Sequence, residues 1–232
     1  MNATRGSISQ VASQSQAGVA APARRRLIDA PTRALHWWLA LSVGLAWITG
    51  DSERWRLLHV CMGYTASGLL AAQLAWGIWS LGLGRRSLRL RATWGKLQAL
   101  PSWLRHWRAG RPDLTQAQHL LLAATVLLMP VTLALSLLTG LPAWLEWPSE
   151  AITDAMADLH GLFSDMVLVA LAGHIGVLIG ISLLRERNLL TPMMHGYTPG
   201  RGPDLVRDNR LGLAMLISLT VLVFWAVRYW LS

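Results

Sequence analysis

Five long apolar runs dominate this 232-residue chain. They extend over about residues 34–50, 57–83, 117–140, 157–184 and 211–231. A helix needs about 20 apolar residues to cross the hydrocarbon core of a bilayer, and its backbone polar groups must be satisfied within the helix. With 53% hydrophobic and 14% charged residues, the chain is predicted to be an all-α integral membrane protein with five transmembrane helices.

The basic residues occupy alternate connections between these spans. All but three of the 21 lysines and arginines precede the first span or lie in the second and fourth connections. The exceptions lie on the other side with six acids: Arg54, Arg56 and Arg228 with Asp51, Glu53, Glu146, Glu150, Asp154 and Asp158. The positive-inside rule then places the N-terminus in the cytoplasm and the C-terminus outside. The formal charge of +9 therefore indicates topology, and nucleic-acid binding is not expected.

The segments outside the spans have distinct compositions. Residues 1–26 are rich in Ala, Ser, Gln and Gly, which predicts a disordered cytoplasmic tail. The second connection carries apolar residues at three- and four-residue steps: Trp94, Leu97, Leu100, Leu104 and Trp107. This pattern is typical of an amphipathic segment on the inner membrane surface, interrupted at Pro101. The third connection, residues 141–158, is acidic and is expected outside.

Two histidines of the fourth apolar run, His160 and His174, are fourteen residues apart. Fourteen helical residues advance about 1400°, close to four full turns, so both imidazoles share a face. They also rise about 21 Å, which places one imidazole near each surface of the ~30 Å core. An imidazole in lipid needs a partner or a metal. The spacing therefore indicates two stacked cofactors, and a pair of b-type haems is the favoured interpretation.

Two other intramembrane histidines supply partners at matching depths. In the predicted topology His36 lies near the cytoplasmic surface and His59 near the outer surface. Depth then pairs His59 with His160 at the outer level and His36 with His174 at the inner level. Haem iron in an electron carrier takes two axial ligands, and a four-helix bundle can supply them from facing helices. The predicted fold is a four-helix transmembrane bundle that binds two haems, followed by a fifth, C-terminal transmembrane helix.

Some positions keep two interpretations. His119, at the start of the third span, is a rival inner ligand, although His36 is favoured. Arg33 and Arg56 could pair with haem propionates, but contact with lipid headgroups explains them equally well. Gly63, one turn after His59, would let a flat ring approach the helix or would simply let two helices pack.

Cysteine chemistry is excluded as the basis of the site. Cys61 is the single cysteine, and the chain has no Cys-x-x-Cys-His motif. Any haem is therefore bound without thioether links, and an iron–sulfur cluster held by four thiolates is ruled out.

Several motifs resemble those of a known family. Residues 31–38 (Pro-Thr-Arg-Ala-Leu-His-Trp-Trp) and 58–64 (Leu-His-Val-Cys-Met-Gly-Tyr) resemble the first two spans of the bacterial cytochrome b561 family. That family includes the b-type cytochrome subunits of nickel–iron hydrogenases. Residues 159–161 and 172–176 look like its fourth span, and residues 188–196 resemble the segment that follows in the hydrogenase-type branch. The resemblance covers about residues 27–200 and is weakest in the third span.

The resemblance implies a dihaem cytochrome b of the bacterial inner membrane. Such a protein passes electrons between the quinone pool and a periplasmic redox partner, either a hydrogenase or a c-type cytochrome. By motif, His36, His59, His160 and His174 would be the axial ligands of the haem iron. Residues 27–200 would form the haem bundle and residues 201–232 the fifth helix. An electron-transfer subunit is favoured over a stand-alone enzyme.

Two alternative functions remain open. A self-sufficient superoxide:quinone oxidoreductase of the same fold would need a cationic outer haem edge to attract its anionic substrate, whereas the outer connections are acidic. A haem-free proton-coupled transporter could use the histidines as proton relays, but internal repeats or broken helices are not visible. The outer acids Glu146 to Asp158 instead predict docking of a basic periplasmic partner over the outer haem, unless they only keep a loop soluble.

Overall fold

The computed structural model describes residues 24–82, 95–111, 113–146, 149–200, 202–206 and 208–230. This part of the chain is mainly helical. Its elements, in order, are β1 (Arg24–Arg26), α2 (Ala30–Thr49), the 3-10 turn η1 (Glu53–Trp55), α3 (Arg56–Gly82), α5 (Leu100–Arg108), α6 (Leu114–Leu145), α7 (Glu150–Leu184), α8 (Thr191–His195), β2 (Tyr197–Pro199) and α9 (Leu211–Trp230).

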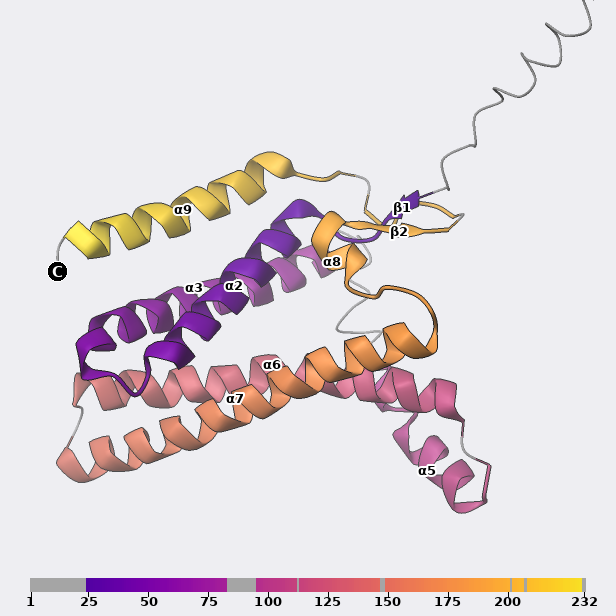
Figure 1. Cartoon of the computed structure of the whole chain (residues 1–232), viewed down its shortest axis with the longest axis horizontal. Coiled ribbons are helices and arrows are strands. Elements are labelled where there is room, and N and C mark those ends of the chain that lie inside the picture. Colours follow the sequence, from indigo (N-terminus) through magenta and orange to yellow (C-terminus); the bar gives the residue numbers. More distant parts are fainter. Residues whose placement is uncertain are drawn as a thin grey trace, which may run out of the picture.

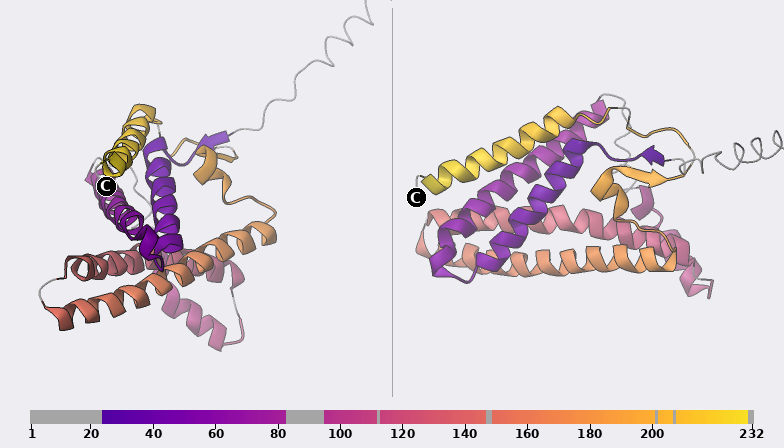
Figure 2. Two further views of the ribbon diagram at one scale, coloured as in Figure 1. Left: turned by 60° about the vertical axis from the view of Figure 1, so that its left-hand side comes forward. Right: turned by 45° about the horizontal axis from the view of Figure 1, so that its top comes forward.

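The long helices are arranged in two layers. Helices α6 and α7 run side by side, and α2 and α3 cross over them (Figure 1). Helix α9 packs on α2, on the side of the molecule away from α6 and α7 (Figure 2). The turn between α2 and α3, the end of α6, the start of α7 and the end of α9 lie at one end of the molecule, whereas β1, β2, α5 and α8 lie at the other (Figure 1). After the predicted topology, these are called the outer and the cytoplasmic end.

Four of the described helices are long and apolar enough to cross a membrane. They cover Glu53–Gly77, Leu114–Leu145, Glu150–Leu184 and Leu211–Trp230. The protein is therefore a multi-pass membrane protein. Helix α2 is not among the four because its 20 residues include Arg33, His36 and three tryptophans, which lower its mean hydropathy. It packs along α3, and its role as the first span stays a prediction.

Two of the helices, α6 and α7, extend beyond the predicted spans. The Asp113 carboxylate accepts hydrogen bonds from the backbone N–H of Thr115 and Gln116 at 2.9 and 3.0 Å, so α6 begins before its apolar run. Glu146, with φ of 52°, ends α6 in the left-handed conformation. Helix α7 starts at Glu150, seven residues before the predicted span. The outer connection is therefore residues 146–149, not 141–158, because hydropathy marks the segment within lipid and not the full helix.

Two further expectations change at the cytoplasmic end. Residues 24–26, assigned by composition to the tail, form β1, which pairs antiparallel with β2; residues 1–23 lie outside the described residues. The amphipathic segment is the helix α5, and Pro101 lies in its first turn. Proline is tolerated there because the N–H that it lacks would have no helical partner. Pro101 therefore starts this helix instead of interrupting it, and Trp94 lies outside the described residues.

Two small apolar clusters join the helices. Leu35, Leu69 and Val221 connect α2, α3 and α9. The second cluster, Leu70, Leu133 and Val167, connects α3, α6 and α7, and Leu39 and Val43 of α2 pack against it. This second cluster, called the central layer below, brings all four helices of the predicted bundle together at mid-height.

Candidate functional site

The central layer separates two levels of histidines. His160 and His174 are each seven residues from Val167, in opposite directions along α7, which is about 10 Å of helix on either side. His59 lies on the outer side of the layer, before Leu70 in α3, and His36 lies on the cytoplasmic side, before Leu39 in α2. Each level therefore holds one histidine of α7 and one of the α2–α3 pair.

At the outer level the rings of the predicted partners His59 and His160 lie next to each other. The centroids of their rings are 5.9 Å apart, and the ring planes are inclined at 84°. An imidazole nitrogen lies about 2 Å from a metal that it binds, so two rings on opposite sides of one iron atom have centres roughly 6 Å apart. The two side chains are thus spaced as a pair of axial ligands would be.

The end of α2 orients the ring of His59. The Nδ1 atom of His59 is 2.8 Å from the carbonyl oxygen of Ala46. Carbonyls in the last turn of a helix lack regular helical donors, and the N–H of Gly50 turns to Trp47 at 3.3 Å. The Ala46 carbonyl is therefore available to accept from His59, and the Thr49 hydroxyl also approaches it, at 3.2 Å.

Helix α6 orients the ring of His160 in a similar way. The Nδ1 atom of His160 is 2.8 Å from the carbonyl oxygen of Ser136. The Ser136 hydroxyl lies 3.4 Å from the same nitrogen and 2.9 Å from the hydroxyl of Ser164. One turn on, Gly140 leaves space for the ring, since a Cβ atom there would lie 2.8 Å from Cε1 and Nδ1 of His160. Sequence reasoning missed Ser136, Gly140 and Ser164, although small residues four apart on a membrane helix are typical of close helix contacts.

These hydrogen bonds fix the tautomer of both outer histidines. A carbonyl oxygen only accepts, so Nδ1 of His59 and Nδ1 of His160 must each carry a proton. Neutral imidazole protonated at Nδ1 has an unprotonated Nε2, whose lone pair can bind a metal. Metal-binding histidines usually donate their other N–H to a carbonyl or carboxylate in this manner. The residues present at the outer level therefore fit ligation of a haem iron.

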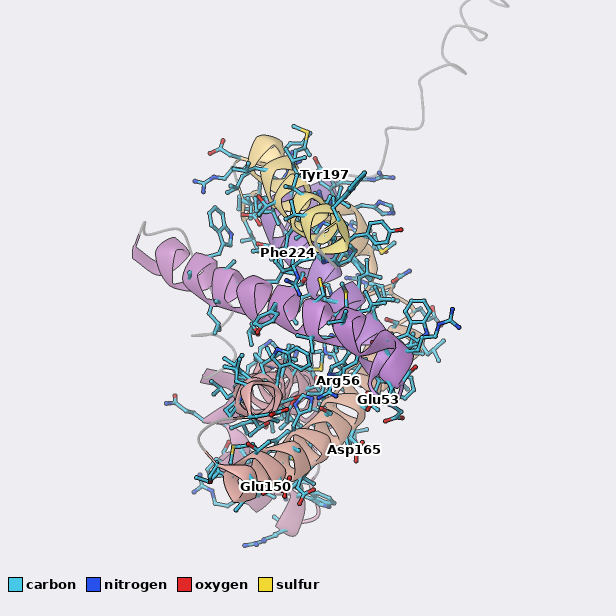
Figure 3. All side chains as sticks on the ribbon, turned by 90° about the vertical axis from the view of Figure 1, so that its left-hand side faces the viewer. Glu53, Arg56, Glu150, Asp165, Tyr197 and Phe224 are labelled. Carbon is cyan, nitrogen blue, oxygen red and sulfur yellow. The ribbon has the colours of Figure 1, made fainter. Side chains whose placement is uncertain are left out.

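The surroundings of this pair provide space on one side and charge at the outer end. A Cβ atom added at Gly63, one turn after His59 on the same face of α3, would meet no atom within 4 Å, so a flat ring could lie there. Arg56, the predicted propionate contact, lies 3.7 Å from the Glu53 carboxylate and 5.3 Å from the centroid of the Trp144 ring. Figure 3 shows Glu53 and Arg56 together at the outer end of α3.

At the inner level, His174 contacts α6. Its Nδ1 atom is 3.5 Å from the hydroxyl of Thr125, and that hydroxyl donates to the Leu122 carbonyl at 3.0 Å. Nδ1 of His174 is therefore the donor to Thr125, which again leaves Nε2 with the lone pair. His36 lies in the second turn of α2, half-buried, with its ring 5.4 Å from that of Trp37. The pairing of His36 with His174 stays a prediction.

The rival ligand His119 lies closer to the cytoplasmic end than His174. It is six residues before Thr125 in α6, or about 9 Å of helix. Its neighbour Gln118 accepts a hydrogen bond from Nε of Arg185 at 3.0 Å, which sets His119 level with the end of α7. His119 is exposed. The choice between His36 and His119 as the inner ligand stays a prediction.

The segment after α7 packs on the start of α2, on both sides of His36. Nη1 of Arg33 lies 3.4 Å from the Met194 carbonyl, and Nε1 of Trp37 donates to the Met193 carbonyl at 3.2 Å. The guanidinium of Arg33, predicted as a propionate contact, is therefore directed at the backbone of α8.

Gly196 completes this contact. Its carbonyl accepts from the N–H of Leu27 at 2.8 Å. It has φ of 86°, and a Cβ atom there would lie 2.8 Å from the Ile28 carbonyl oxygen, so only glycine fits. Next to it, Nη2 of Arg26 donates to the Tyr197 hydroxyl at 2.7 Å, and this hydrogen bond raises the pKa of Arg26.

The outer acids do not form a loop over the histidine pair. Glu150, Asp154 and Asp158 follow one another at four-residue steps on α7 and are exposed; Figure 3 shows Glu150 on this helix. Asp158 and His160 are two residues apart, which is about 200° around a helix. Asp158 therefore lies on a different face of α7 from His160, whereas Glu150, ten residues before His160, is only about 80° from it around the helix.

Comparison with known proteins agrees with this geometry. Residues 27–196 match the family model of prokaryotic cytochrome b561. The match covers most of the chain, which belongs to this family. No curated protein and no solved structure gives a match. The family consists of membrane b-type cytochromes that act in electron transfer, so the chain is a membrane electron carrier that binds haem b.

Proposed function

We propose that the chain is a dihaem b-type cytochrome that transfers electrons between the quinone pool of the bacterial inner membrane and a periplasmic hydrogenase or c-type cytochrome. His59 and His160 would ligate the outer haem, and His36 and His174 the inner haem. The observation that most supports this proposal is the outer pair. Its rings are 5.9 Å apart, and both Nδ1 atoms lie 2.8 Å from backbone carbonyls.

The protein would hold the haem ligands in position, exclude water from the space between the two levels and set the basicity of the imidazoles. Haem b, when bound, supplies a one-electron couple. The carbonyls of Ala46 and Ser136 hold the two outer imidazoles and increase their basicity, which is a means of tuning a reduction potential. The central layer of Leu70, Leu133 and Val167 keeps water away from the space between the two levels. The two levels are about 21 Å apart along α7, so electrons would cross most of the membrane.

A role as the electron-transfer subunit of a larger complex suits the outer surface. The exposed acids of α7 would favour a partner with a basic face. They would repel superoxide, which disfavours the self-sufficient oxidoreductase.

Haem stoichiometry and single histidine variants test this proposal. The purified protein should contain two non-covalent b haems per chain in a pyridine haemochrome assay. His59→Ala or His160→Ala should remove the outer haem and keep most of the inner one, and His36→Ala or His174→Ala should do the reverse. His106→Ala, on the exposed α5, is the matched control and should keep both. One haem or none per chain in the wild type would contradict the proposal.

A further inference from the structure

A hollow opens at the cytoplasmic end of α6, on the surface beside His119. Its larger part has a volume of about 330 Å³ and lies between α6 and the helical turn at residues 95–99, with Lys96, Gln116 and His119 among its lining residues. An adjoining part of about 150 Å³ lies between α6 and α7 and is lined by Lys96, His119 and Arg185 among others. Lys96 and His119 line both parts, so the two parts form one continuous depression.

Hydrogen bonds fix the elements that bear its charges. The Gln116 side chain donates to the Ala99 carbonyl at 3.4 Å, which ties the turn bearing Lys96 to α6. Nε of Arg185 donates to Gln118 at 3.0 Å, which ties the end of α7 to α6. The nearby Asp113 carboxylate is engaged by two backbone N–H groups of α6. None of the described residues that line the hollow is acidic.

The remaining walls are apolar, and they lead toward the membrane. Leu120 and Leu122 of α6 and Ile181 of α7 line the hollow on the side of the membrane-spanning parts of these helices. Cations at the membrane surface above apolar walls match an amphiphile with an anionic head. A neutral quinone head would not require two cations.

We propose that this hollow binds an anionic phospholipid of the inner leaflet, with Lys96 and Arg185 paired to the headgroup phosphate and the acyl chains along α6 and α7. His119 would donate a further hydrogen bond to a phosphate oxygen. The proposal assigns His119 to lipid binding and not to haem, and it goes beyond electron transfer. A basic residue near an anionic lipid headgroup strengthens binding by a factor of about 5.

Lipid titration of the solubilised full-length protein tests the proposal. Phosphatidylglycerol with a fluorescent acyl chain should bind saturably, and phosphatidylcholine with the same chain should bind much more weakly. The double variant Lys96→Gln/Arg185→Gln should weaken phosphatidylglycerol binding by about 30-fold, from two such factors. The control Arg105→Gln/Arg108→Gln removes the same charge from α5, outside the hollow, and should change the affinity less than twofold. Unchanged elution and circular dichroism would show that both variants are folded.

Four results would overturn the assignment. Equal binding of the two lipids, or equal weakening by the test and control variants, would mean that the hollow does not select an anionic headgroup. Competition by inorganic phosphate as strong as that by the lipid would identify a free-phosphate site. Displacement of the fluorescent lipid by a neutral short-chain quinone at equal concentration would assign the hollow to quinone.

Discussion

The close approach of Gly140 to His160 makes a sharp test of the outer site. In Gly140→Ala, the new Cβ atom would lie 2.8 Å from Cε1 and Nδ1 of His160, where carbon atoms in contact need about 3.5–4.0 Å. Either α6 and α7 separate by several tenths of an ångström or the His160 ring turns off the Ser136 carbonyl. Overpacking of this kind costs about 1–3 kcal/mol, and loss of the hydrogen bond adds about 1 kcal/mol.

Redox titration of the purified variant, followed in the visible spectrum, is the appropriate assay. We expect Gly140→Ala to lower the affinity of the outer site for haem by at least tenfold or to shift the midpoint potential of the outer haem. The inner haem should be unchanged. Gly176→Ala is the matched control, because a Cβ atom there meets nothing within 4 Å. If Gly140→Ala keeps a full outer haem with an unaltered spectrum and potential, His160 is not held against α6 as described.

Three other variants test the inner level, the cytoplasmic contact and the outer face. His119→Ala should keep the inner haem while His36→Ala removes it, as haem content will show; the opposite result would reverse the ligand assignment. Gly196→Ala should lower thermal stability by about 1–3 kcal/mol because its φ of 86° is strained for alanine, whereas Gly161→Ala, in open space, should not. Neutralising Glu150, Asp154 and Asp158 should slow electron exchange with a basic partner only at low salt, because charges on an exposed surface are screened beyond about 10 Å at 0.1 M ionic strength. Stopped-flow rates that change neither with these substitutions nor with the ionic strength would exclude docking on this face.

The spacing of the histidines along the helices and their depth in the membrane were sufficient to predict much of the bundle. The fourteen-residue interval between His160 and His174 sets two levels on one face of a helix, whatever the helix packs against. The alternation of basic connections fixes which histidines share a level. These inferences depend on helix geometry and on the cost of charge in lipid, and both act locally. Sequence reasoning therefore paired His59 with His160, and the structure brings these two side chains together.

The features that sequence reasoning missed depend on the position of the backbone. The Ala46 and Ser136 carbonyls carry no sequence signature, because every residue has one. Ala46 becomes an acceptor only because α2 ends at Thr49, and Ser136 because Gly140 lets α7 approach. The connection before the fourth span was predicted too long for a related reason. Hydropathy ends the span near residue 157, whereas the helix starts at Glu150, so Glu150, Asp154 and Asp158 belong to α7 and not to a loop.

The two histidines of α7 differ in how firmly the protein holds them, and this difference predicts an order of haem binding. Both outer imidazoles donate to backbone carbonyls at 2.8 Å, whereas His174 reaches a side-chain hydroxyl at 3.5 Å. A good hydrogen bond contributes about 1 kcal/mol, so the shorter bond of His160, compared with that of His174, favours the outer site by about fivefold in affinity. Substoichiometric haem added to the apoprotein should therefore fill the outer site first. His174→Ala should not change the spectrum of this first haem, and His160→Ala should abolish it. If the inner site fills first, ligand positioning by the backbone does not control haem affinity in this bundle.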